Sequence, residues 1–81
     1  MKTIVNYSYE EFLKKLDEKG LLSFRGFDNP QIEYQTAKAK HIRWIQSRYE
    51  ALAVSLNNQP LSPDKFDGFC SLVAGDLRFI Y

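Results

Sequence analysis

The chain contains 81 residues, of which 44% are hydrophobic and 15% aromatic. This composition is too apolar for an intrinsically disordered protein, and the length predicts a single globular domain, residues 1–81, with one modest core. The formal net charge of +1 excludes a strongly acidic mimic of DNA. It also provides no overall field that would attract the protein to nucleic acid or to an anionic membrane.

Cysteine content and hydropathy predict the cellular compartment. The single cysteine, Cys70, cannot form a disulfide within the chain, which favours a reducing environment. The first residues lack the long apolar stretch of a secretory signal, and no apolar run approaches the length needed to cross a bilayer. We therefore expect a cytoplasmic protein that makes no membrane contact.

The first part of the chain predicts a short extended segment and then a helix. Residues 3–6 include a β-branched run, which favours an extended conformation. Ser8 and Glu11 have the spacing of a capping box, and apolar residues recur at helical intervals in the following turns. Gly20 has the position of a C-terminal cap, so the predicted helix covers residues 9–19.

A long central helix is the main predicted element. Residues 21–26 alternate apolar and polar side chains, which predicts a short strand before it. The helix is expected over residues 31–57, because this stretch contains neither proline nor glycine and Pro60 forbids its continuation. The apolar residues in its second half recur on one stripe: Ile42, Ile45, Tyr49, Leu52, Ala53 and Leu56.

The last part of the chain predicts a third helix and a terminal strand. Ser62 and Pro63 are typical of the first positions of a helix, and Gly75 is typical of its end, so this helix is expected over residues 63–74. Residues 76–81 alternate apolar and polar side chains, which predicts a strand. The fold class is therefore mostly α or α+β, with the central helix as its spine.

These faces also predict the core. Eight residues from the three helices are expected to be buried together: Phe12, Leu16, Ile42, Ile45, Leu52, Leu56, Phe69 and Val73.

The residue types that catalysis requires are scarce. His41 is the only histidine, and Cys70 lies on the apolar face of its predicted helix, where a cysteine is usually a small core residue. One histidine and one cysteine supply too few ligands for a structural zinc site, and no glycine-rich phosphate loop is present. We expect no catalytic residues, no metal site, no cofactor and no enzymatic activity.

The charge distribution is the one feature that points to a function. No acidic residue lies between Tyr34 and Tyr49, and the basic residues there flank Trp44. Aromatic residues and arginine are enriched at binding hot spots, and the candidate partner-binding residues are Lys40, Arg43, Trp44 and Arg48. The alternative is a solvated cationic face with Trp44 packed beneath the first helix.

Two functional classes follow from this segment. The first is a non-enzymatic regulator or inhibitor that occupies the surface of a protein partner, and self-association as a homodimer through the long helix belongs to the same class. The second is a nucleic-acid-binding protein that uses the same basic and aromatic segment. The missing catalytic groups and the near-neutral charge favour a protein partner.

Overall fold

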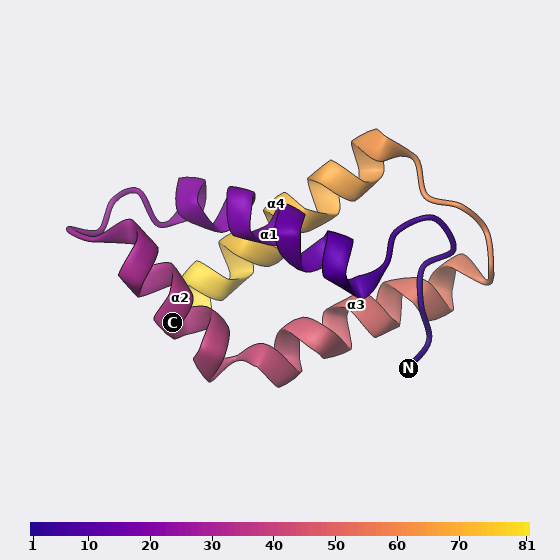
Figure 1. Cartoon of the computed structure of the whole chain (residues 1–81), viewed down its shortest axis with the longest axis horizontal. Helices are drawn as coiled ribbons and strands as arrows, with labels where there is room; N and C mark the ends of the chain where they lie inside the picture. The colour runs from indigo at the N-terminus through magenta and orange to yellow at the C-terminus, as the bar shows by residue number, and fades with distance from the viewer.

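In the computed structural model, which describes all 81 residues, four helices surround one apolar core (Figure 1). They are α1 (Tyr9–Ser23), α2 (Pro30–Lys40), α3 (Ile42–Leu56) and α4 (Pro63–Ile80). No strand forms, and the only β-type pairing is an isolated bridge between Ile4 and Tyr7. The mostly helical alternative is therefore confirmed, and the α+β alternative is wrong.

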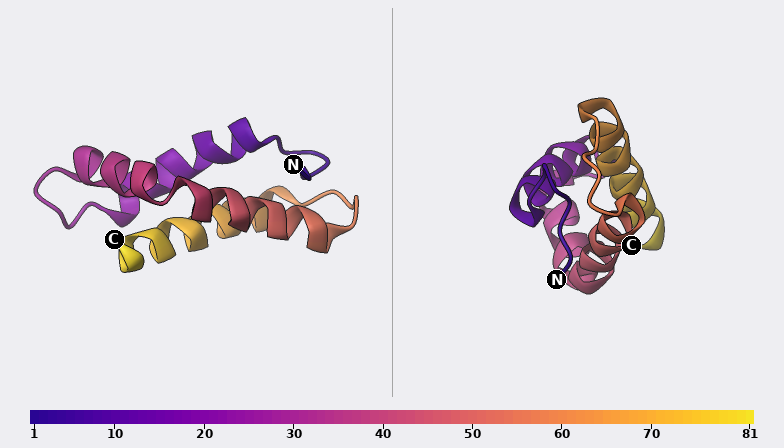
Figure 2. Two further views of the ribbon diagram at one scale, coloured as in Figure 1. Left: turned by 90° about the horizontal axis from the view of Figure 1, so that it is seen from below. Right: turned by 90° about the vertical axis from the view of Figure 1, so that its right-hand side faces the viewer.

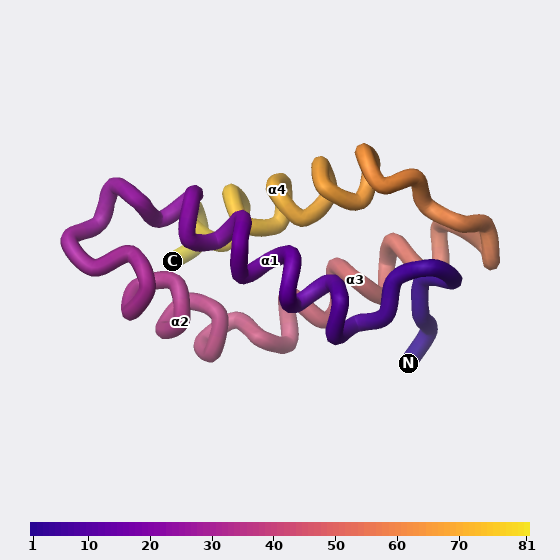
Figure 3. Tube along the Cα trace, turned by 45° about the horizontal axis from the view of Figure 1, so that its top comes forward, coloured from indigo at the N-terminus to yellow at the C-terminus, as the bar shows by residue number.

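The helices form three elongated segments: α1, α4, and the consecutive pair α2 and α3 (Figure 2). The molecule measures 40 × 23 × 18 Å along its principal axes. α1 and α4 run in the same direction, as Figure 3 shows, and they pack directly against each other. α2 and α3, which lie between them in the sequence, together run back in the opposite direction. Ring contacts at both ends fix the parallel pair: Phe12 lies 5.5 Å from Phe69, and Phe24 lies 5.8 Å from Tyr81, between ring centroids. None of the four helices combines the length and the hydropathy that a membrane span requires.

The core contains fifteen buried apolar residues from all four helices, the N-terminal segment and two connecting segments: Ile4, Phe12, Leu16, Phe24, Tyr34, Ala37, Ile45, Tyr49, Ala53, Leu61, Phe66, Cys70, Val73, Ala74 and Leu77. The predicted core is only partly correct. Leu52, Leu56 and Phe69 are partly buried at its margin, and Ile42 is 39% exposed. Ile42 lies on the same helical row as Tyr49 and Ala53, but it is the first residue of α3, at the end of the helix next to the break at His41.

Helix α1 begins where the capping box predicts and ends later than expected. The Ser8 hydroxyl accepts a hydrogen bond from the Glu11 amide at 3.1 Å, and the Glu11 carboxylate accepts one from the Ser8 amide. The predicted stop at Gly20 is wrong, because this glycine lies inside the helix and is buried. A Cβ atom there would lie 2.1 Å from Cε1 of Tyr34. Gly20 thus permits the close approach of the α2 aromatic ring rather than a left-handed cap.

The predicted central helix over residues 31–57 is not found, because the chain changes direction at His41. This residue has φ −116° and ψ 26°, and it separates α2 from α3. In one uninterrupted helix, Ala37 and Ala53 would lie about 160° apart around the axis. Both are buried in the core. The break therefore allows α2 and α3 each to turn its own apolar face toward the core.

The short extended segment predicted at 3–6 and the strands predicted at 21–26 and 76–81 are not found either. Residues 21–23 extend α1, and α4 continues through Gly75 to Ile80. Residues 3–6 form a turn whose bridge pairs Ile4 with Tyr7. The alternation at 76–81 predicts a strand, but Leu77 also lies four residues after Val73, on the same face of a helix. Both side chains are buried in the core, and only a helix places them on one face.

Tyr49 of α3 holds the N-terminal segment in place through hydrogen bonds. The Tyr49 hydroxyl accepts a hydrogen bond from the Ile4 amide at 3.1 Å and donates one to the Tyr7 carbonyl at 2.6 Å. Asn6 exchanges two further hydrogen bonds with the backbone of Leu61, in the loop between α3 and α4. This segment therefore closes one end of the core although it has no regular secondary structure.

Asp67 of α4 connects that helix to α1 through two lysines. Its carboxylate lies 2.8 Å from the Lys19 ammonium and 3.3 Å from that of Lys15. The hydrogen bond from Lys19 is the main reason that the pKa of Asp67 lies below its ordinary value of 3.8. The hydrogen bond to Asp67 is the main reason that the pKa of Lys15 lies above its ordinary value of 10.5.

These shifts predict how stability depends on pH. A lowered carboxylate pKa stabilises the fold above pH 3.8, and this contribution disappears as the pH falls through the folded-state pKa. The raised pKa of Lys15 acts in the opposite direction, and its contribution disappears as the pH rises above 10.5. Urea unfolding of Asp67→Asn is expected to show a flatter decline below pH 4 than the unmodified protein. Equal acid slopes for the two proteins would contradict the assignment.

Candidate functional site

The four sequence-predicted contact residues lie on two helices rather than one. Lys40 is the last residue of α2, whereas Arg43, Trp44 and Arg48 belong to α3. The three basic side chains are exposed. Trp44 is half-buried and packs against the core, so only part of its indole ring remains available to a partner.

Helix geometry brings two of the four residues together. Trp44 and Arg48 are one turn apart on α3, about 40° around the helix axis. Arg43 lies about 140° from Arg48 and therefore belongs to a different side of the helix. Lys40 precedes the break at His41, so the periodicity of α3 does not determine its direction. The predicted set thus contains a Trp44–Arg48 pair and two separate cations.

The unpaired charges of this region are fewer than the sequence suggests. Lys38, which belongs to the same basic run, lies 2.9 Å from Asp17 of α1, and the Tyr34 hydroxyl donates to the same carboxylate at 2.6 Å. Burial is the main reason that the pKa of Tyr34 is raised. Lys40, Arg43 and Arg48 take part in none of the four ion pairs of the structure.

An open groove between α3 and α4 lies beside Arg48. Its volume is about 270 Å³, and its walls are formed by Arg48, Ala51, Leu52, Ser55 and Phe69. Leu52 and Phe69 provide an apolar floor that is continuous with the core. A groove with an apolar floor and one guanidinium at its rim can accept an apolar side chain with a neighbouring carboxylate.

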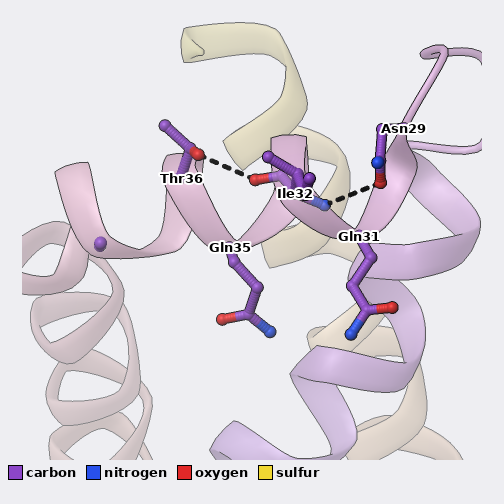
Figure 4. Close-up of a pocket in the computed structure, with 6 residues that line it drawn as sticks. Asn29, Gln31, Ile32, Gln35 and Thr36 are labelled. Atoms are coloured by element: carbon purple, nitrogen blue, oxygen red, sulfur yellow. Dashed lines mark hydrogen bonds between the residues drawn. The ribbon is translucent and has the colours of Figure 1, made fainter.

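The largest hollow of the surface lies elsewhere, along the outer face of α2. It has a volume of about 730 Å³ and is lined only by uncharged residues: Asn29, Gln31, Ile32, Gln35, Thr36 and Ala39. Figure 4 shows the Gln31 and Gln35 amides extending from one side of the helix. The other polar groups serve the helix itself, since Asn29 caps the Ile32 amide and Thr36 donates to the Ile32 carbonyl. The side chains that line this hollow include no acid or base, and its one hydroxyl, that of Thr36, is bonded to the Ile32 carbonyl.

No protein-family model, curated protein or solved structure matches this chain. The candidate site therefore rests on the exposure, charge and shape of its own residues.

Cys70 and His41 lie in different surroundings. Cys70 is buried in the core, and burial raises the pKa of its thiol to about 12, which keeps it protonated at neutral pH. Only the thiolate is an effective nucleophile. His41 lies at the break between α2 and α3, where its Nε2 atom is buried and has no hydrogen-bond partner.

Sequence reasoning missed two parts of this site for one reason. The neutralisation of Lys38 depends on Asp17, and the groove depends on Phe69, and both residues come from helices distant in the chain. Neither pairing has a local signal in the sequence. The helical spacing of Trp44 and Arg48 was the only signal available, and Arg48 lies on the α3 side of the groove.

Proposed function

We propose that this protein is a non-enzymatic binding module that acts as a regulator or inhibitor by occupying the surface of a protein partner. The proposed contact residues are Lys40, Arg43, Trp44 and Arg48. Trp44, Arg48 and the groove beside Arg48 form the centre of the surface, and Lys40 and Arg43 are separate exposed cations outside that pair. The single observation that supports it most is that the three cations are exposed and unpaired while Trp44 keeps part of its ring accessible.

The chemistry of the surface favours a particular kind of partner. Unpaired cations at a rim steer an acidic surface toward the protein and set its orientation. The half-buried indole and the floor of Leu52 and Phe69 provide the apolar contact that such an interface needs at its centre. The expected partner segment therefore combines at least one carboxylate with an apolar anchor.

The decisive measurement uses a partner recovered by chemical crosslinking from the cells that produce the protein. Trp44→Ala is expected to weaken binding of that partner by about 2 kcal/mol, roughly 30-fold, because aromatic anchors dominate hot spots. Arg48→Glu should weaken it further by opposing the partner's carboxylate. Circular dichroism of each variant verifies that the helices remain folded.

A matched control separates this surface from general charge effects. Lys14 is an exposed cation on α1 that forms no ion pair. Lys14→Glu makes the same charge change as Arg48→Glu and is expected to leave binding unchanged. A partner that binds both variants with the affinity of the unmodified protein would place the interface elsewhere.

Nucleic-acid binding is the second candidate, favoured by the same unpaired cations. Its signature is a steep dependence on salt, because each neutralised phosphate releases counterions and contributes about −0.9 to the slope of log K against log salt on duplex DNA. Three cations therefore predict a slope near −3 with labelled oligonucleotides. A protein partner held mainly by Trp44 should show a much shallower slope.

A further inference from the structure

The outward face of α4 carries two large apolar side chains that no part of this chain covers. Leu72 is 55% exposed and Phe79 is 90% exposed. Gly68 and Gly75 lie on the same line, with intervals of four, three and four residues from Gly68 to Phe79. Both glycines are exposed, and a Cβ atom at either position would meet nothing within 4 Å. We call these four residues the α4 outer stripe.

The side chains of the α4 outer stripe are, from its N-terminal end, small, large, small and large. Two copies of this stripe fit each other only when the two helices run antiparallel. When a second copy of the helix runs antiparallel, Phe79 faces the partner's Gly68, and Leu72 faces the partner's Gly75. A parallel copy would oppose phenylalanine to phenylalanine and leave voids at the glycines. The four–three–four spacing is that of a coiled-coil seam, in which large side chains enter spaces on the facing helix.

Charges at the edge of the stripe agree with the antiparallel orientation. Asp64, Ser71 and Arg78 recur every seven residues along one edge. The Arg78 guanidinium lies 5.3 Å from the ring centroid of Phe27 in its own chain. Antiparallel pairing places position 78 on the edge that faces the N-terminal half of the partner's α4, where the partner's Ser71 and the partner's Asp64 lie. It also sets the positive end of each helix dipole beside the negative end of the other.

The available area determines how strong such a contact can be. The stripe spans twelve residues, about 16.5 Å of helix. A standard stable interface buries about 800 Å² on each partner, roughly a sixth of the 5168 Å² surface of this chain. Two apolar side chains per copy provide less than that, which corresponds to a weak and reversible dimer.

We propose that a second copy of this chain docks antiparallel on the α4 outer stripe, so that the protein forms a weak two-fold symmetric dimer. This goes beyond the proposed function, because the stripe shares no residue with the surface around Trp44. It also replaces the homodimer through a long central helix that the sequence predicts, since that helix is divided at His41.

Sedimentation equilibrium from about 10 µM to about 1 mM tests the proposal, with a concentration-dependent rise in average mass as the expected result. Gly75→Leu should lower the association constant at least tenfold, because it sets leucine against the partner's Leu72. The same change should raise the urea midpoint of the monomer, since leucine favours a helix more than glycine does. Lost association therefore cannot reflect unfolding.

The exchange variant Leu72→Gly/Gly75→Leu keeps the composition of the chain and restores the pairing of large with small. It should recover most of the lost association, whereas Phe79→Ser should abolish it. Val54→Ser removes a similarly exposed apolar side chain from α3 and should change nothing. A mass that stays monomeric to 1 mM, or an exchange variant no better than Gly75→Leu, would overturn the proposal.

Disulfide trapping tests whether the two α4 helices of the dimer run antiparallel. In a mixture of Ser71→Cys and Arg78→Cys chains, antiparallel docking should yield mainly the mixed disulfide, because these positions face each other across the two-fold axis. A product dominated by either Cys variant paired with itself would contradict this antiparallel register and overturn the proposal.

Discussion

Gly20→Ala is expected to destabilise the fold by about 3 kcal/mol or more, a large part of the total stability of a domain of this size. The added Cβ atom would lie 2.1 Å from Cε1, 2.4 Å from Cδ1 and 2.6 Å from Cζ of Tyr34. The Tyr34 ring cannot turn aside, because it is fully buried and its hydroxyl is bonded to Asp17. The change must therefore separate α2 from α1.

Urea unfolding followed by circular dichroism measures this effect, and two further variants define its cause. Gly75→Ala inserts the same methyl group into a helix where nothing lies within 4 Å, and it should stabilise the protein by about 1 kcal/mol. Combining Gly20→Ala with Tyr34→Leu removes the ring and should recover part of the loss. A Gly20→Ala protein as stable as the parent would show that α1 and α2 are not packed in this way.

Tyr49→Ala is expected to have the second largest effect, about 3–5 kcal/mol. The ring is fully buried and lies 5.3 Å from the rings of both Tyr9 and Phe12, so its removal leaves a cavity between α1 and α3. It also removes the hydroxyl that holds Ile4 and Tyr7. Tyr49→Phe retains the ring and should cost only about 1–3 kcal/mol, from the polar groups left unpaired.

Hydrogen exchange distinguishes the two contributions. The Ile4 amide donates to the Tyr49 hydroxyl, so its exchange should accelerate in both variants, while amides within α4 should accelerate only in Tyr49→Ala. Tyr81→Phe is the matched control, because it removes the hydroxyl of an exposed tyrosine that is bonded only to Glu33. Unchanged protection of Ile4 in Tyr49→Phe would show that the N-terminal segment is held by other contacts.

Local signals in the sequence were sufficient for the starts of α1 and α4, but not for the start of α3 at Ile42. The Ser8 and Glu11 box and the Ser62 cap are each completed within four residues, and the structure contains both. Apolar spacing likewise identified most of the buried faces, because a helix repeats its own geometry every few residues. For the candidate site, the sequence identified Trp44 and Arg48, which one helix holds a turn apart.

Tertiary contacts decided what local signals could not. A glycine can end a helix or permit a close contact inside one. Gly20 lies inside α1 because the Tyr34 ring packs directly against it. The sequence around His41 contains no residue that typically ends a helix. The chain nevertheless changes direction there, between α2 and α3, because Ala37 and Ala53 must both be buried. Leu77 and Phe79 suit one face of a strand, but α4 buries the first and exposes the second. In each case the residue has two compatible local conformations, and the free energy of burying side chains distant in the sequence selects between them.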